Sequence, residues 1–350
     1  MSARQRLRAV LLERLDALGV FERLRARHRT SVTVLQYHGV TASGQDKGTS
    51  FRRKHVDVER FTRQMQWIRE RYNVVSLDRV IAHYREGTPL PDFPAALTFD
   101  DGFRNNYAVA YPILSALALP ATIFVPTDFI SGKGSLWLDR IEYALYQTGQ
   151  PHLVLDILRV PVALRLTSDR ERTESKKLLK NLLRESSPDL IASVVAQLEA
   201  RAGAALGGDR HAQGDYAPLT GDELGEMHGS GLISVGSHTV THPILPRCSP
   251  AQLEAELTVS KRTIESLLGH ACRLFCYPNG EVDAPTKAAV ARAGYAGAVC
   301  SRAGLNARGA DVFALTRLGI PGTLPMAEFA ALVSGGLFLL RGLRSRVVPV

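Results

Sequence analysis

The stretch Ala95-Ala96-Leu97-Thr98-Phe99-Asp100-Asp101-Gly102 places two adjacent acidic residues directly after a mostly apolar run. The run is typical of a buried strand, and the glycine indicates a turn at its end. Two neighbouring carboxylates at a buried strand end cost desolvation energy and raise each other's pKa unless a positive charge lies between them. The stretch therefore predicts a functional site with a positive partner for the two acids.

The chain around this stretch alternates strand and helix patterns, which predicts an α/β fold with a parallel sheet or barrel and helices outside it. The predicted strands are 32–37, 95–99, 121–125, 232–236, 273–277, 296–300 and 315–320. The predicted helices are 58–72, 77–85, 106–117, 221–228, 250–268 and 284–293. Residues 131–218 interrupt this alternation, and their Leu-, Lys- and Glu-rich pattern predicts a mostly helical insertion with strands only near 153–158 and 160–166.

Basic residues gather at the two ends of this 350-residue chain, whose formal net charge is +9. Residues 1–30 predict an amphipathic helix with eight arginines against three acids, and residues 326–350 predict a helix followed by a basic tail. Such ends suit an anionic lipid surface, and a solvated basic helix explains them equally well. With no secretory pattern, no spanning apolar run and no nucleic-acid motif, we expect a cytoplasmic protein, at the inner membrane surface if its ends bind lipid.

A second motif, Gly236-Ser237-His238-Thr239-Val240-Thr241-His242-Pro243, follows the predicted strand 232–236. Two histidines four residues apart, just past a strand end, can present both imidazoles to one point. In an α/β barrel all strands end at the same mouth, so Asp101 is expected to meet them there. A carboxylate and two imidazoles suit a divalent ion, which leaves Asp100 as the base that takes a proton from metal-bound water.

These two motifs, together with Val34–Val40 (VLQYHGV), Phe275–Gly280 (FCYPNG) and segments of 295–322, resemble the polysaccharide deacetylases, carbohydrate esterase family 4. The resemblance covers roughly residues 31–325 and implies a distorted (β/α) TIM-like barrel with fewer than eight complete units. It implies a metal-dependent hydrolase that removes N-acetyl groups from an amino-sugar polysaccharide, oligosaccharide or lipid-linked glycan. The expected ion is zinc, with cobalt, nickel or manganese as alternatives. A metal- and glycan-binding protein without turnover and an O-acetyl esterase remain as other interpretations.

Two positions depart from the family pattern. Cys276 stands where the family has an arginine that orients the base, and Arg317 stands where a histidine acid is often found. We expect Arg317 to pair with Asp100 and so to replace the missing arginine. The backbone N–H of Asn279 is expected to bind the oxyanion, since a backbone donor needs no particular side chain. The leaving-group proton is then expected from Asp100 or from His38.

Four side chains are predicted to contact the substrate: His38, Trp137, Tyr277 and Asn306. His38 ends the first predicted strand, and a hydrogen-bonded histidine beneath the site is the alternative. Trp137 opens the insertion and offers a flat face to a sugar ring, with plain packing as the alternative. His55, which follows Arg52-Arg53-Lys54, is interpreted as a solvated loop residue.

Overall fold

The centre of the protein is a parallel sheet, seen in a computed structural model that describes residues 3–42, 54–205 and 217–336. Its strands are β1 (Thr33–Tyr37), β4 (Asn73–Val74), β5 (Pro94–Phe99), β6 (Ala121–Val125), β9 (Ile233–Ser237), β10 (Leu274–Cys276), β11 (Gly297–Val299) and β12 (Leu318–Gly319). Their order is β11-β10-β9-β6-β5-β1-β12, with β4 beside β5. The strands β5 and β6 are buried at every residue, as expected of a parallel sheet covered on both faces.

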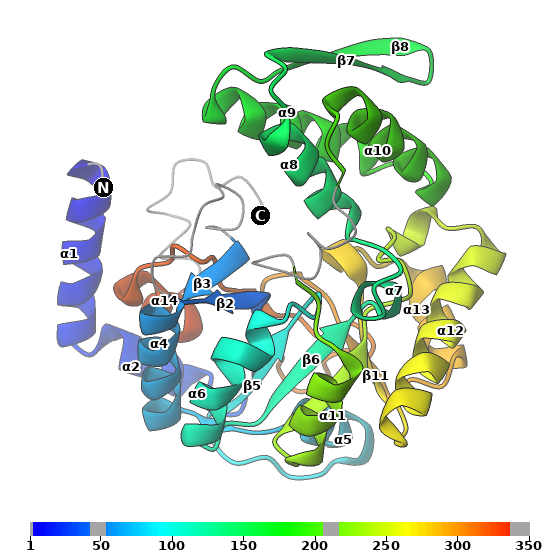
Figure 1. The fold of residues 1–350 in the computed structure, drawn as a ribbon. Helices are drawn as coiled ribbons and strands as arrows, with labels where there is room; N and C mark the ends of the chain where they lie inside the picture. The colour runs from blue at the N-terminus through cyan, green and yellow to red at the C-terminus, as the bar shows by residue number, and fades with distance from the viewer. Residues whose placement is uncertain (1–2, 43–53, 206–216, 337–350) are drawn as a thin grey trace.

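The sheet is twisted and curled (Figure 1), and one segment joins its two edges. Leu318 of β12 pairs with Leu35 of β1, and Leu315 bridges to Val299 of β11. Residues 315–319 therefore contact both edges of the sheet. This geometry confirms a distorted barrel with fewer than eight complete strand–helix units.

Helices cover the outside of the sheet, and all of them except the short α7 (Thr127–Ile130) lie where the sequence predicts a helix. They are α4 (Val58–Arg71), α5 (Leu77–Glu86), α6 (Tyr111–Ala116), α7 (Thr127–Ile130), α11 (Gly221–Gly229), α12 (Pro250–Leu268), α13 (Ala284–Arg292) and α14 (Met326–Val333). A short π-helix, η1 (Asn106–Ala110), leads directly into α6. Several begin at a side chain that accepts a hydrogen bond from the first turn, such as Thr220 in α11 and Ser249 in α12. These caps satisfy backbone donors that a helix start leaves open.

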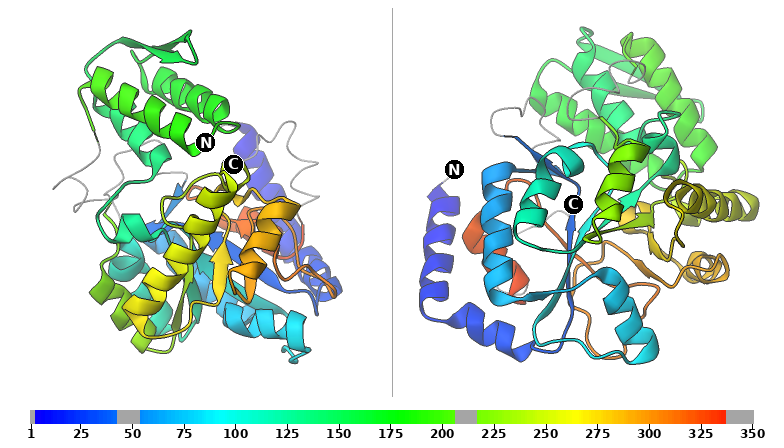
Figure 2. Two further views of the ribbon diagram at one scale, coloured as in Figure 1. Left: turned by 90° about the vertical axis from the view of Figure 1, so that its right-hand side faces the viewer. Right: turned by 60° about the horizontal axis from the view of Figure 1, so that its bottom comes forward.

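The insertion forms a helical layer with a hairpin above the barrel (Figure 2). It contains α8 (Trp137–Gln147), the hairpin β7 (His152–Ile157)–β8 (Val160–Arg165), α9 (Asp169–Leu183) and α10 (Pro188–Ala202). Alternate residues of β7 are buried, and they pack with apolar residues of the three helices in a core of their own. The mostly helical character and the hairpin agree with the sequence prediction.

The N-terminal segment differs from the single helix expected over residues 1–30. It forms α1 (Ala3–Ala17) and α2 (Val20–Arg27), because Gly19 adopts a left-handed conformation with φ 71° that ends α1. Both helices pack on α14 through Leu12 and Phe21. The predicted C-terminal helix is present over α14, whereas the basic tail lies outside the described residues. Within the described ranges, no helix is both long enough and apolar enough to cross a membrane.

Candidate metal and catalytic site

The two acidic residues and the two histidines meet where neighbouring strands end. Asp100 and Asp101 directly follow β5, and His238 follows β9, with β6 between these strands. Because parallel strands present their C-terminal ends at one edge, residues far apart in sequence converge there. All four side chains are buried.

A sharp turn at Asp101 and Gly102 makes the side chains of the two acids point in different directions. Asp101 has φ 73° and Gly102 has φ 70°, so two successive residues adopt the left-handed conformation. Aspartate tolerates this region better than most residues, and glycine adopts it without strain. A Cβ added at Gly102 would lie 2.9 Å from Cγ1 of Val125. The turn therefore requires glycine here, and it gives the two carboxylates different partners.

The partners of Asp101 form a set of metal-type donors. Its Oδ1 lies 3.6 Å from Nε2 of His238 and 3.4 Å from Nε2 of His242. Two ligands bound tetrahedrally to one zinc ion at about 2.0–2.1 Å lie roughly 3.4 Å apart. The three donor atoms lie within 4.8 Å of one another. The residues present therefore fit a divalent ion held by one carboxylate and two imidazoles.

The orientation and charge of His238 suit a metal ligand. Its Nδ1 donates to the backbone carbonyl of Cys276 at 2.7 Å, which leaves Nε2 unprotonated and directed at Asp101. Burial, reinforced by His242, lowers the pKa of His238 to about 4. A neutral imidazole at physiological pH is the form that binds metal.

Asp100 is held by a buried arginine. Arg317 donates from Nη1 to Oδ1 and from Nη2 to Oδ2, both at 2.7 Å, and Gln36 donates to Oδ2 at 2.8 Å. Burial alone would raise the pKa of Asp100, but the guanidinium outweighs it and holds that pKa at about 2. The pairing expected between Arg317 and Asp100 is therefore present, and Asp100 is a carboxylate at neutral pH.

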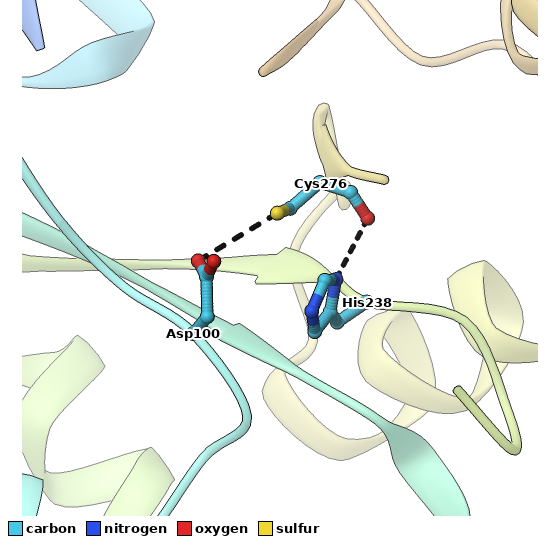
Figure 3. A group of neighbouring side chains, drawn as sticks. All are labelled: Asp100, His238 and Cys276. Atoms are coloured by element: carbon cyan, nitrogen blue, oxygen red, sulfur yellow. Dashed lines mark hydrogen bonds between the residues drawn. The ribbon is translucent and has the colours of Figure 1, made fainter. Parts of the chain in front are cut away.

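The thiol of Cys276 points at Asp100, one member of this ion pair (Figure 3). Its Sγ is 3.6 Å from Oδ1 of Asp100 and 3.1 Å from Nη2 of Arg317. Burial raises the pKa of this thiol well above its usual value, so it is protonated beside Asp100. Arg317 thus contacts Asp100 from a position beside Cys276, the residue that stands where the resemblance implies an arginine.

A lysine that the sequence interpretation passed over also contacts the site. Lys54 places Nζ 2.6 Å from Oδ2 of Asp101 and 3.4 Å from Oδ1 of Asp139, the latter carried by α8 of the insertion. The positive partner of the two acids is thus, in part, this lysine together with Arg317. Lys54 was missed because an Arg-Arg-Lys run is typical of a solvated loop, and only the fold brings it to Asp101.

The interpretation of His55 as a solvated loop residue is wrong. His55 begins β3 (His55–Asp57), which pairs in parallel with β2 (Gly39–Thr41) beside the site, and it is buried. Its Nδ1 lies 2.8 Å from the side-chain amide of Asn105, and its ring packs on Phe103. The pairing of β3 with β2, which precedes it closely in the chain, removes this residue from solvent.

Three of the predicted substrate contacts have structural roles. Tyr277 is fully buried and donates to the backbone carbonyl of Phe313 at 2.8 Å. Asn306 is buried beside Val32, at the opposite end of β1 from the site, and its side chain binds backbone groups there. Trp137 is 7% exposed and packs in the core of the insertion, which favours packing over sugar stacking. Tyr277 and Asn306 are therefore corrected to fold-stabilising residues.

The fourth predicted substrate contact, His38, and the predicted oxyanion donor, Asn279, stay compatible with the geometry. His38 directly follows β1 and is partly buried; burial lowers its pKa, while the nearby charge of Asp101 acts in the opposite direction. Asn279 lies in the turn after β10 with φ 57° and an exposed side chain. Both are at the edge of the sheet that carries the two acids, and their roles stay predictions.

Comparisons with known proteins bear on the family and the fold. A family model described as Polysaccharide deacetylase matches residues 87–159 and 188–298, more than half of the chain. The poly-beta-1,6-N-acetyl-D-glucosamine N-deacetylase of Escherichia coli (strain K12) is 31% identical over 121 residues, which are 32% of this chain and 17% of that protein. The similarity thus spans less than a fifth of that relative's length.

Two solved structures show the same fold at low sequence identity. The deacetylase PplD of Streptococcus pyogenes, solved in complex with acetate, gives a TM-score of 0.57 at 18% identity over 87% of this chain and 99% of that one. A polysaccharide deacetylase from Bacillus cereus gives 0.56 at 20% identity over 87% of this chain and 69% of that one. Both similarities support the barrel assignment.

Proposed function

The chain belongs to the polysaccharide deacetylase family, a family of hydrolases, and we propose that it removes N-acetyl groups from an amino-sugar glycan. The observation that carries the proposal is the convergence of Asp101, His238 and His242 beside the Asp100–Arg317 pair. Amide hydrolysis needs an activated water, a proton acceptor and a donor set for the developing oxyanion. The site brings candidates for these roles to one edge of the sheet.

Asp101, His238 and His242 are the residues that would hold a divalent ion, zinc first and cobalt, nickel or manganese as alternatives. Such an ion supplies a Lewis acid for the acetyl carbonyl and lowers the pKa of water. The backbone N–H of Asn279 is proposed as a further donor to the oxyanion.

Asp100 is the proposed proton acceptor. Arg317 and Gln36 fix both of its oxygens, so the carboxylate has one orientation relative to the three donors. The ion pair makes Asp100 a weak base, since its pKa is about 2. Asp100 would thus contribute a fixed, ionised proton acceptor rather than strong basicity.

The proton for the leaving amine is proposed to come from His38 or to return from Asp100. Arg317 cannot supply it, because a guanidinium does not release a proton near neutral pH. His38 lies close enough to both acids and to Arg317 for their charges to affect its pKa, which burial lowers. A His38→Gln variant that loses acetate release but retains metal would support its role as the acid.

The proposed activity is tested by acetate release from a panel of glycans. The panel contains β-1,6-linked N-acetylglucosamine oligomers, chosen from the Escherichia coli relative, other N-acetylated oligosaccharides and an O-acetylated one. The zinc-loaded full chain is compared with Asp100→Asn and His238→Ala. We expect Asp100→Asn to bind zinc and lose at least about a hundredfold in rate, because a positioned base contributes that much or more.

Bound metal separates the outcomes. His238→Ala should lose both metal and activity, whereas His152→Ala, an exposed histidine of β7, should keep both. If each chain binds one metal ion tightly but releases no acetate from any glycan, the proposed deacetylase activity is overturned and a metal- and glycan-binding protein is favoured. Acetate from the O-acetylated glycan alone would identify an esterase.

A further inference from the structure

An apolar stripe on α1 faces away from the protein. Four side chains along α1 and the turn after it are exposed: Leu7 by 73%, Val10 by 45%, Leu11 by 40% and, in the turn, Leu18 by 67%. Their spacing of three, four and seven residues places them on one side of the helix, together with Arg14. We call these four residues the α1 stripe. Its length is about 16 Å, from a rise of about 1.5 Å per residue.

The packing of α1 does not need the stripe. The side of the helix next to the stripe buries Leu12 completely, in a cluster with Ala330 and Ala331 of α14. An ion pair at 3.2 Å between Arg8 and Glu328 ties the same side to α14. These contacts fix α1 on the body of the protein with the stripe turned outward. The views of Figures 1 and 2 place α1 at the edge of the molecule.

Residues 1–30 as a whole carry a positive charge, although Glu13 and Asp16 are exposed on α1 itself and Arg8 is paired with Glu328. Residues 1–30 carry eight arginines against three acids, and Arg14 lies within the stripe itself. Exposed Arg23 and Arg27 of the adjoining α2 add to this charge. Aliphatic side chains on a helix with arginines nearby suit a lipid surface, in which anionic head groups lie over an apolar interior.

We propose that the α1 stripe docks the protein on an anionic lipid surface, with the stripe inserted among the head groups and the arginines paired with their phosphates. A single helix at the molecular edge is a convex ridge, which inserts into lipid more readily than it fills a partner's groove. A symmetric contact between two copies would bring Arg14 and its neighbours against the same positive charges, so a second copy is disfavoured.

The test is flotation of the full chain with vesicles of phosphatidylcholine, with and without phosphatidylglycerol. We expect binding to the anionic vesicles that is weakened by salt. The double variant Leu7→Glu, Leu18→Glu should lose at least tenfold in partitioning, because it loses two apolar contacts and gains two negative charges that the anionic lipid repels. The matched control is Leu158→Glu, at the hairpin tip of the insertion, where a leucine is 74% exposed. This control should bind as the wild type does.

Each remaining outcome overturns the proposal. These outcomes are no binding by the wild type, undiminished binding by the double variant, or an equal loss in the Leu158 control. Light scattering in the absence of lipid adds one more: a dimer that the double variant dissociates would make the stripe an interface between copies. Both variants change exposed residues only, so an unchanged thermal melt excludes misfolding as the cause. Acetate release from soluble glycans should be unaffected, which keeps this test independent of the proposed activity.

Discussion

Arg317 forms a two-pronged ion pair with Asp100 across 217 residues of sequence, with both N–O distances at 2.7 Å. The guanidinium is fully buried, and it also donates to Thr98 Oγ1, to the backbone carbonyl of Cys300 and to the sulfur of Cys276. A buried charge of this kind is tolerated only when its partner stays in place. The pair is therefore both a structural tie across the barrel and the support of the proposed base.

Removing one partner of this pair should cost more stability than removing both. Arg317→Met leaves the Asp100 carboxylate buried without its cation, a change worth about 3–5 kcal/mol. Adding Asp100→Asn to that variant should recover part of the loss. Urea unfolding measures both, with Arg170→Met as the control, since its pair with Glu174 is exposed and should contribute little. A double variant less stable than Arg317→Met would contradict this account.

The arginine that supports Asp100 should be transferable between strands. Cys276→Arg alone should destabilise the protein, because Arg317 Nη2 already lies 3.1 Å from the sulfur and a second buried guanidinium has no carboxylate. Combining Cys276→Arg with Arg317→Met should raise the melting temperature again, and Cys276→Ala serves as the control for loss of the thiol. A fully stable Cys276→Arg variant would show that the two side chains do not compete for one space.

Zinc should stabilise the folded chain through three named residues. A ligand at a hundred times its dissociation constant adds about 2.7 kcal/mol to the free energy of unfolding. We expect a corresponding rise in melting temperature for the wild type and for Asp100→Asn, and none for His242→Ala. The exposed His152→Ala variant should respond as the wild type does. An unchanged zinc response in His242→Ala would remove this histidine from the ligand set.

Lys54 should weaken metal binding, because its ammonium lies 2.6 Å from the second oxygen of Asp101. Lys54→Met removes a positive charge beside a proposed ligand, which should tighten zinc by the order of tenfold in a titration against a chelator. Lys54→Arg retains the charge and should behave more like the wild type. Equal or weaker affinity in Lys54→Met would indicate that the lysine orients Asp101 instead of opposing the metal.

Gly102 should tolerate alanine less well than another glycine of the same conformation. Gly102→Ala combines a left-handed φ of 70° with a Cβ at 2.9 Å from Val125, whereas a Cβ at Gly132 with φ 71° has no neighbour within 4 Å. Each substitution carries backbone strain of about 1–2 kcal/mol, and only Gly102→Ala adds the clash. Thermal melts of the two variants measure the difference, and equal melting temperatures would contradict it.

The alternation of apolar strands and amphipathic helices was readable because hydrophobic period reports local structure directly. The same reasoning placed Asp100, Asp101, His238 and His242 together, since parallel strands end at one edge. Period two also held a signal that went unused. Residues two apart on a strand lie on one face, so Gln36 shares a face of β1 with Val34, and Asp100 continues the face of β5 that carries Thr98. Because Gln36 pairs with Thr98, the polar side chains of Gln36, Thr98 and Asp100 all lie on the inner face of the sheet.

The remaining parts of the site depend on contacts that no local pattern contains. Tyr277 follows Cys276 on the chain but packs in a different core cluster, so one reaches Asp100 and the other a distant carbonyl. His55 is buried by a strand pairing, and Lys54 meets Asp139 only because the insertion lies over the barrel. Local sequence pattern was enough to predict most strands and helices of the barrel, their order and the residues at the strand ends. The side chains that surround those residues could be found only in the folded protein, because burial and charge pairing depend on neighbours brought together from different parts of the chain.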